Sequence, residues 1–212
     1  MPRPRKARRD AEANRERLLA AAVTAMLREG RNVPLATIAA EAGLGIGTLY
    51  RSYPDRDALL HALEYRAYGL LNGILDGIEE EAGLGGLDAV ARFLEGSLIV
   101  GDQLVLPLHG APPLLTPEAV EARRAINRRL EHFIAAGRAE GTIHSPVNAT
   151  DIITFSAMIT YPRSHDLDWD HLARRQIALF LNGVATGGPA AVPGPPVERT
   201  GVEQAFERQA RP

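Results

Sequence analysis

Side chains that can bind phosphate and touch base edges are concentrated in the stretch GTLYRSYPDRDALL (47–60). Thr48, Tyr50 and Arg51 carry hydroxyl, phenol and guanidinium groups, which donate hydrogen bonds to phosphate oxygens. Pro54 ends the segment, so any helix that carries these groups is about two turns long. Arg56 follows at once and can reach an adjacent phosphate. This combination is typical of a surface that contacts nucleic acid.

Two short helical segments must position these groups. The sequence predicts helices at 34–41 and 46–53, joined by a turn in which Gly43 can adopt a positive φ. Small residues such as Ala39 let two helices cross closely. The pattern predicts a helix-turn-helix, whose second helix needs only two turns to enter a DNA major groove.

The rest of the chain also has helical periodicity, and its strand signals are weak, so we predict an all-α fold. The further helices are predicted at 14–29, 54–81, 87–100, 103–108, 117–139, 148–160 and 169–185. From Gly187 the chain becomes rich in proline and glycine (GGPAAVPGPP), which predicts a disordered tail over 187–212.

The net charge of −2 conceals a marked asymmetry between the two parts of the chain. Residues 1–66 hold 12 Lys and Arg against 8 Asp and Glu, whereas residues 67–212 hold 12 against 18. Five of the cations lie within the first nine residues: Arg3, Arg5, Lys6, Arg8 and Arg9. Such a basic arm commonly contacts phosphate, although it could equally be a solvated tail.

Composition excludes several classes of protein. The chain has no cysteine, so it has no disulfide framework, cysteine metal site or thiol nucleophile, as expected in a reducing compartment. No apolar run approaches the length of a membrane span, and the basic N-terminus lacks the apolar stretch of a signal peptide. We therefore expect a cytoplasmic protein that does not enter a membrane.

The stretch IAAEAGLGIGTLYRSYPDRDALL (38–60) resembles the DNA-binding signature of the TetR family of transcriptional regulators. The likeness covers about residues 14–62, and the later helices match only in number and length. It implies a basic arm at 1–13, a helix-turn-helix domain at 14–62 and a helical ligand-binding and dimerisation domain at 63–186. It further implies a homodimer that binds a palindromic operator on double-stranded DNA and is released from it by a small molecule.

Several residues depart from the family pattern. Val33 and Pro34 stand where a capping Thr or Ser is usual, and Gly45 replaces the Ser cap of the recognition helix. Tyr53 replaces a core Phe, and Ile46 replaces a polar residue, so Ile46 can contact a thymine methyl but cannot recognise guanine. The resulting candidates for DNA contact are Thr37, Ile46, Gly47, Thr48, Tyr50, Arg51, Tyr53 and Arg56, with Arg5 and Lys6 of the arm in the minor groove.

An effector pocket, if the resemblance holds, lies among the helices at 63–81, 87–100, 117–139 and 148–160. Its candidate residues are Phe93, His109, Arg123, Asn127, Phe133 and Met158. The alternatives are ordinary core packing for the apolar residues and a solvated face for Arg123 and Asn127.

The dimer is expected to form through 148–160 and 169–185, which carry wide apolar faces. Those faces contain Ile152, Ile153, Phe155, Ile159, Ile177, Phe180, Leu181 and Val184. Ordinary core packing is again the alternative.

The cluster HDLDWDH (165–171) has residue types that bind metals, but Asp166 or Asp168 suits the N-cap of the following helix better. We expect no metal and no cofactor. Two other functional classes stay open, an all-α enzyme and a protein-interaction adaptor. The chain lacks the nucleophile elbow, zinc-protease, phosphate-loop and dinucleotide motifs, so we do not expect an enzyme. An adaptor would leave the DNA-binding signature unexplained.

Overall fold

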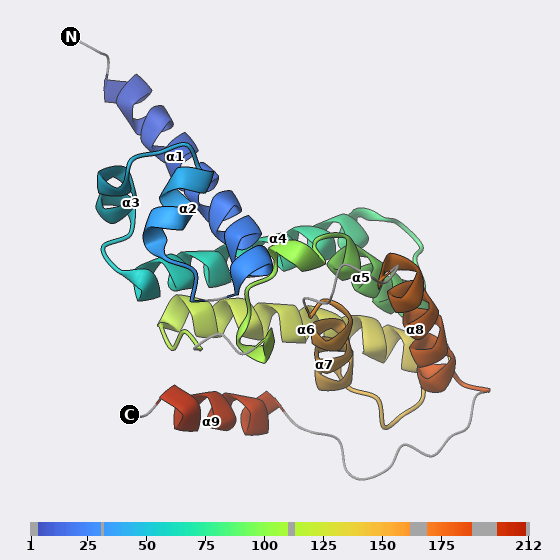
Figure 1. The fold of residues 1–212 in the computed structure, drawn as a ribbon. Coiled ribbons are helices and arrows are strands. Elements are labelled where there is room, and N and C mark those ends of the chain that lie inside the picture. The colour runs from blue at the N-terminus through green and yellow to red at the C-terminus, as the bar shows by residue number, and fades with distance from the viewer. Residues whose placement is uncertain (1–3, 31, 110–112, 162–168, 188–198, 211–212) are drawn as a thin grey trace. The chain divides into compact units, whose positions relative to one another are not determined.

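The protein is described by a computed structural model of residues 4–30, 32–109, 113–161, 169–187 and 199–210 (Figure 1). The described residues contain nine α-helices and no strand, which confirms the all-α prediction. Contacts divide the chain into two compact units, Met1–Tyr65 and Arg66–Pro212. No helix of the described residues is long and apolar enough to cross a membrane.

The first unit contains α1 (Pro4–Glu29), α2 (Leu35–Glu41), α3 (Ile46–Ser52) and the start of α4 (Arg56–Glu80). Helix α1 begins ten residues before the predicted start at 14, because proline is tolerated in a first turn and the following Ala, Arg and Glu are good helix formers. One apolar stripe of α1 packs on α2, and its fully buried members are Leu18, Ala22 and Ala25.

The second unit contains the rest of α4, then α5 (Gly86–Ile99), α6 (Pro117–Ala139), α7 (Ala149–Ile159), α8 (Trp169–Val184) and α9 (Arg199–Ala210). The predicted helix at 103–108 is wrong. Two 3-10 turns, η1 (Gly101–Gln103) and η2 (Pro107–His109), flank an extended segment instead, because Pro107 has no amide hydrogen with which to continue an α-helix.

Helices α5 and α6 cross at a pair of glycines. A Cβ atom at Gly86 would lie 2.2 Å from the backbone nitrogen of Gly137 and 2.3 Å from the carbonyl oxygen of Phe133. The amide of Gly86 also donates to the carboxylate of Glu140, at 3.0 Å. The two backbones can approach this closely only because no side chain stands between them.

Polar side chains cap three of the helices. Thr116 accepts from the amide of Ala119 at the start of α6, and Asn148 forms a reciprocal capping box with Asp151 at the start of α7. Asp55 accepts from the amide of Ala58 at 2.7 Å at the start of α4. These caps fix where the helices begin.

Helices α7 and α8 are joined by aromatic contacts. Phe155 stacks on Phe180 with a centroid separation of 4.0 Å, and the indole nitrogen of Trp169 donates to the carbonyl of Ile159 at 2.8 Å. Four residues predicted on the dimer faces are instead buried inside the unit: Ile152, Ile159, Ile177 and Val184. The prediction was wrong for these four because apolar periodicity alone does not distinguish a core face from an interface.

Helix α9 lies within the segment predicted as a disordered tail. Its sequence, RTGVEQAFERQA, has no proline and several good helix formers, which favours a helix over this stretch. The proline-rich residues 188–198 that gave rise to the prediction lie outside the described residues.

Candidate nucleic-acid interface and ligand pocket

The turn between α2 and α3 is tight and tied to α1. Gly43 has a φ of +64°, and the amide of Leu44 donates to the carbonyl of Ala39 at 2.9 Å. The guanidinium of Arg17 on α1 donates to the carbonyl of Ala42 at 2.6 Å. Arg17, which the sequence analysis missed, therefore holds the turn in place.

Helix α3 has a buried side and an exposed side. Leu49 is fully buried and anchors the helix. On the opposite side Ile46 is 41% exposed and Tyr50 is 51% exposed, and Gly47 and Arg51 are also exposed. The guanidinium of Arg51 donates to the hydroxyl of Thr48 at 3.0 Å. This exposed side brings together the apolar, phenolic and cationic groups that could contact a DNA groove. Thr37 and Thr48 are half-buried.

Tyr53 is a core residue in this structure, so its prediction as a DNA contact needs correction. Its ring is buried, with the guanidinium of Arg15 5.7 Å from the ring centroid. Burial raises the pKa of Tyr53 above its usual value, although the charge of Arg15 acts to lower it. The spacing of four residues from the buried Leu49 was a signal that Tyr53 faces inward.

Arg56 has a structural contact in addition to its predicted role at phosphate. Its guanidinium donates to the carbonyl of Val33, which ties the first turn of α4 to the residues before α2. Arg15, another cation that the sequence analysis missed, donates to the carbonyl of Ser52 at 3.3 Å, at the last residue of α3. The side chains of Arg5 and Lys6 lie outside the described ones.

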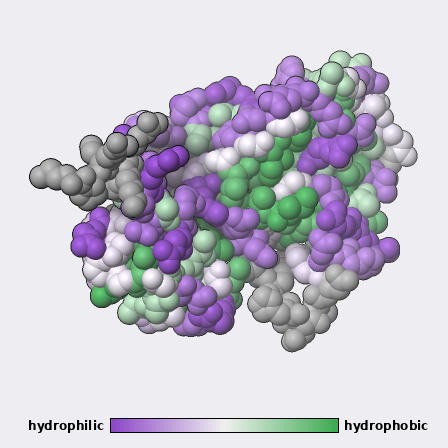
Figure 2. Space-filling model, turned by 90° about the horizontal axis from the view of Figure 1, so that it is seen from above, coloured by the Kyte–Doolittle hydropathy of each residue, from purple (hydrophilic) through white to green (hydrophobic). Residues whose placement is uncertain are grey.

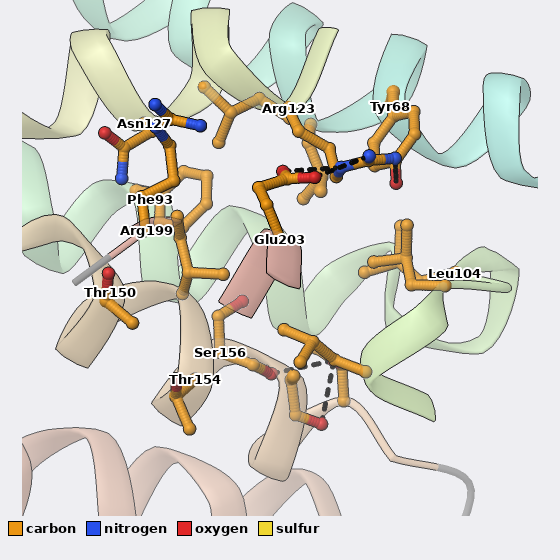
Figure 3. A pocket seen from close by; sticks show the side chains of 17 residues that line it. Tyr68, Phe93, Leu104, Arg123, Asn127, Thr150, Thr154, Ser156, Arg199 and Glu203 are labelled. Atoms are coloured by element: carbon orange, nitrogen blue, oxygen red, sulfur yellow. Dashed lines mark hydrogen bonds and ion pairs between the residues drawn. The ribbon is translucent and has the colours of Figure 1, made fainter. Parts of the chain in front are cut away.

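A pocket in the second unit encloses about 830 Å³ of space, part of it open to solvent (Figure 3). Helices α4, α5, α6, α7 and α9 and the segment between η1 and η2 all contribute to its wall. The wall is mainly apolar and includes Leu71, Phe93, Leu104, Leu106, Ile126 and Ile153. Its polar members include Asn127, Thr150 and Ser156. A pocket of this kind suits an apolar ligand with few polar groups.

Arg123 is the charged group of the α6 wall. Its Nε and Nη2 donate to the two carboxylate oxygens of Glu203 on α9, at 2.9 Å and 2.8 Å. Its Nη1 donates to the carbonyl of Leu114 at 2.9 Å and lies 3.4 Å from the phenol oxygen of Tyr68. Burial acts to lower the pKa of Arg123, but the hydrogen bonds to Glu203 and Tyr68 outweigh it and raise that pKa. Arg123 is therefore permanently charged.

Three of the six predicted pocket residues line this pocket: Phe93, Arg123 and Asn127. The other three do not, because the packing of distant segments places them elsewhere. His109 is buried in a hydrogen-bond network, with Nδ1 2.9 Å from the carbonyl of Leu104 and Nε2 3.1 Å from the hydroxyl of Thr160. Phe133 lines a separate hollow formed by α4, the start of α5 and α6, and Met158 is exposed.

The described residues contain no group of three or more His, Asp or Glu side chains that could hold a metal ion. Residues 162–168, which include most of the HDLDWDH cluster, lie outside the described part of the chain. Asp170 within α8 pairs with Arg174, one helical turn later, at 3.0 Å.

The surface of the molecule includes apolar side chains as well as charged ones. On the face seen in Figure 2, the largest hydrophobic patch lies near the middle and is bordered by hydrophilic residues, and smaller hydrophobic patches lie elsewhere. Among the described residues of the second unit, the exposed large hydrophobic side chains are Ile99, Leu108, Leu115, Met158, Tyr161 and Leu179. Patches of this kind commonly mark contacts between proteins.

Comparison with known proteins points to one family. Residues 18–63 match the sequence profile described as bacterial regulatory proteins of the tetR family. No curated protein matches the chain.

Solved structures extend the likeness along the chain. A TetR transcriptional regulator from Streptomyces coelicolor is 29% identical, with 82% of this chain and 99% of that one covered and a TM-score of 0.55. A ketosteroid transcriptional regulator of Mycobacterium tuberculosis is 16% identical over 81% and 95% of the two chains, with a TM-score of 0.61. AibR, in complex with isovaleryl coenzyme A and operator DNA, is 15% identical over 78% and 97%, with a TM-score of 0.63.

Proposed function

We propose that this chain, whose residues 18–63 match the tetR family of bacterial regulatory proteins, is a repressor that a small molecule releases from a palindromic operator. The match at residues 18–63 and the similar solved structures support a DNA-binding transcriptional regulator. We propose in addition the palindromic operator, the small-molecule effector and the release step.

The exposed side of α3 is the observation that carries this proposal. Leu49 and Tyr53 anchor a two-turn helix while Ile46, Tyr50 and Arg51 point away from the core. In this arrangement Tyr50 and Arg56 contact phosphates, Ile46 and Arg51 face the bases, and Arg5 and Lys6 reach the minor groove. Arg56 would have to exchange its contact with Val33 for a phosphate or serve both.

A short recognition helix is insufficient for a specific site, so two copies of the chain are required. We place the dimer on the exposed sides of α7 and α8, which carry Met158 and Leu179. A two-fold dimer through these helices would present two copies of α3 to successive major grooves, about 34–36 Å apart on DNA.

The pocket supplies the regulatory half of the proposal. A ligand that binds one arrangement of the dimer more tightly than another shifts the equilibrium toward that arrangement. If the favoured arrangement no longer matches the spacing of the two grooves, the operator is released.

Fluorescence anisotropy with labelled DNA flanking the protein's own gene tests the proposal. Arg51→Ala is expected to weaken specific binding by about 1–3 kcal/mol, because Arg51 is placed at base edges. Tyr50→Phe should weaken binding to all sequences alike, because it removes a phosphate contact. Arg28→Ala is the matched control, since Arg28 is an exposed cation of the same unit that pairs with Glu29 and Glu41.

If Arg51→Ala and Arg28→Ala weaken binding alike, the proposed docking of α3 is wrong. If the wild-type protein binds no DNA duplex, the whole proposal is wrong, and an adaptor or an all-α enzyme is favoured.

A further inference from the structure

The pocket contains a buried cation that needs an anion. The side chain of Arg123 is only 10% exposed and borders a wall made mainly of leucine, isoleucine and phenylalanine. A guanidinium in such surroundings is strongly unfavourable unless a negative charge and well-aligned hydrogen-bond acceptors accompany it. The carbonyl of Leu114 satisfies one nitrogen but brings no charge.

The anion in this structure comes from the far end of the chain. Glu203, 80 residues after Arg123, offers both carboxylate oxygens to two nitrogens of the guanidinium, at 2.9 Å and 2.8 Å (Figure 3). Such a two-pronged arrangement is the geometry that arginine adopts with any free carboxylate. Glu203 and Arg199, both on α9, are themselves members of the pocket wall. The end of the chain therefore supplies a carboxylate inside the ligand pocket.

We propose, building on the effector-release function above, that the pocket binds an apolar monocarboxylate, whose carboxylate replaces Glu203 on Arg123. The replacement conserves charge and hydrogen bonds, since one carboxylate leaves the guanidinium as another arrives. The apolar body of the ligand lies against Leu71, Phe93 and Ile126, beside Arg123. The guanidinium of Arg123 offers one pair of nitrogens to a carboxylate, so it holds one carboxylate at a time.

Helix α9 thereby acts as an internal competitor. Because Glu203 is attached to the same chain, it is present at a high effective concentration and lowers the apparent affinity for a free acid. Removing the charge of Glu203 should therefore strengthen the binding of a carboxylate, whereas removing a pocket contact would ordinarily weaken ligand binding.

Isothermal calorimetry with octanoate, on the full-length protein without DNA, tests this directly. Octanamide is the neutral probe of nearly the same shape. We expect octanoate to bind more tightly than octanamide, and Glu203→Gln to strengthen octanoate binding about tenfold, since hydrogen bonds to charged groups are worth more than about 1.4 kcal/mol. Glu207→Gln is the matched control, because Glu207 is exposed on the same helix and its replacement makes the same change in net charge.

Arg123→Gln keeps a donor for the carbonyl of Leu114 and removes the charge. It should abolish the preference for octanoate over octanamide, and a thermal melt of the same sample establishes that the variant is folded. If octanoate binds no variant, if octanamide binds equally well to the wild type, or if Glu203→Gln and Glu207→Gln are indistinguishable, the inference is overturned.

Failure of this inference is distinguishable from failure of the proposed function. Binding of octanoate is measured without DNA, and operator binding is measured separately without octanoate. Tight octanoate binding that leaves the protein–operator complex intact would support the carboxylate site and contradict effector release. Operator release by another ligand, with no octanoate binding, would support effector release and contradict the carboxylate site.

Discussion

Replacing Gly86 by alanine adds only one methyl group, but it should strongly destabilise the second unit. The added Cβ would lie 2.2 Å from the nitrogen of Gly137 and 2.3 Å from the oxygen of Phe133. Both are backbone atoms of α6, so neither can rotate away. Reaching an ordinary van der Waals separation requires α5 and α6 to move apart by about 1 Å.

The cost can be estimated from the consequences of that movement. Overpacking typically costs about 1–3 kcal/mol when side chains can adjust, and here only backbones can, so we expect at least about 3 kcal/mol. For a unit of this size that corresponds to a fall in Tm of roughly 6–12 °C. Because α5 carries Phe93 and α6 carries Arg123, separation of the two helices should also weaken binding in the pocket.

Gly77→Ala is the matched control. Gly77 lies on an exposed part of α4, and a Cβ there would meet no atom within 4 Å. The same substitution should stabilise the protein by about 0.5–1 kcal/mol, because alanine restricts the unfolded chain more than glycine does. Urea denaturation followed by circular dichroism measures both variants. Equal effects of the two substitutions, or a Gly86→Ala protein as stable as the wild type, would refute the reasoning from the helix crossing.

Three further outcomes are expected. Leu179→Glu places a charge at a position that is 54% exposed in the single chain, so it should split the dimer at micromolar concentration without loss of helicity. Light scattering measures the dimer and circular dichroism measures the helicity. A folded variant that stays dimeric would place the interface elsewhere. Phe180→Glu is a poorer test, because Phe180 stacks inside the unit. Deletion of residues 1–9 should lower both DNA affinity and the slope of its salt dependence, and an unchanged slope would show that the arm does not contact phosphate. Because the pKa of Tyr53 is raised in the folded state, its contribution to stability is fully present below pH 10 and is lost as the pH rises through the folded pKa. Tyr53→Phe should therefore reduce the alkaline loss of stability in pH-dependent melts. An identical alkaline profile of the two proteins would contradict this.

The helix-turn-helix could be predicted from sequence because its signals are local. Gly43, Gly45 and Pro54 punctuate the chain within a dozen residues, and each acts on the backbone beside it. The same local reasoning placed α6 and α7 within one residue of their observed bounds. The same reasoning gave a wrong prediction for Tyr53. Its likeness to a core phenylalanine and its spacing from Leu49 both indicated that this side chain is buried.

The pocket could be predicted only in part, because its wall combines segments that are distant in sequence. Phe93, Arg123 and Asn127 lie on inward sides of long helices, and helical spacing found them. The surroundings of His109 and Met158 depend on how the residues around η2 pack against α7. Helical periodicity does not predict that packing. The pairing of Arg123 with Glu203 could not be predicted either, since nothing in the sequence of α9 indicates that its carboxylate will lie beside a guanidinium 80 residues earlier in the chain.

The hydrogen bond from Trp169 to the carbonyl of Ile159 has a practical consequence, because this is the only tryptophan in the chain. Excitation at the red edge of the indole band selects this residue over the five tyrosines. All of the indole emission therefore originates at the junction of α7 and α8, and Ala157 and Thr160 beside that junction line the pocket. The protein thus carries an intrinsic optical reporter, whose wavelength maximum registers changes in polarity and hydrogen bonding at this junction without any added dye.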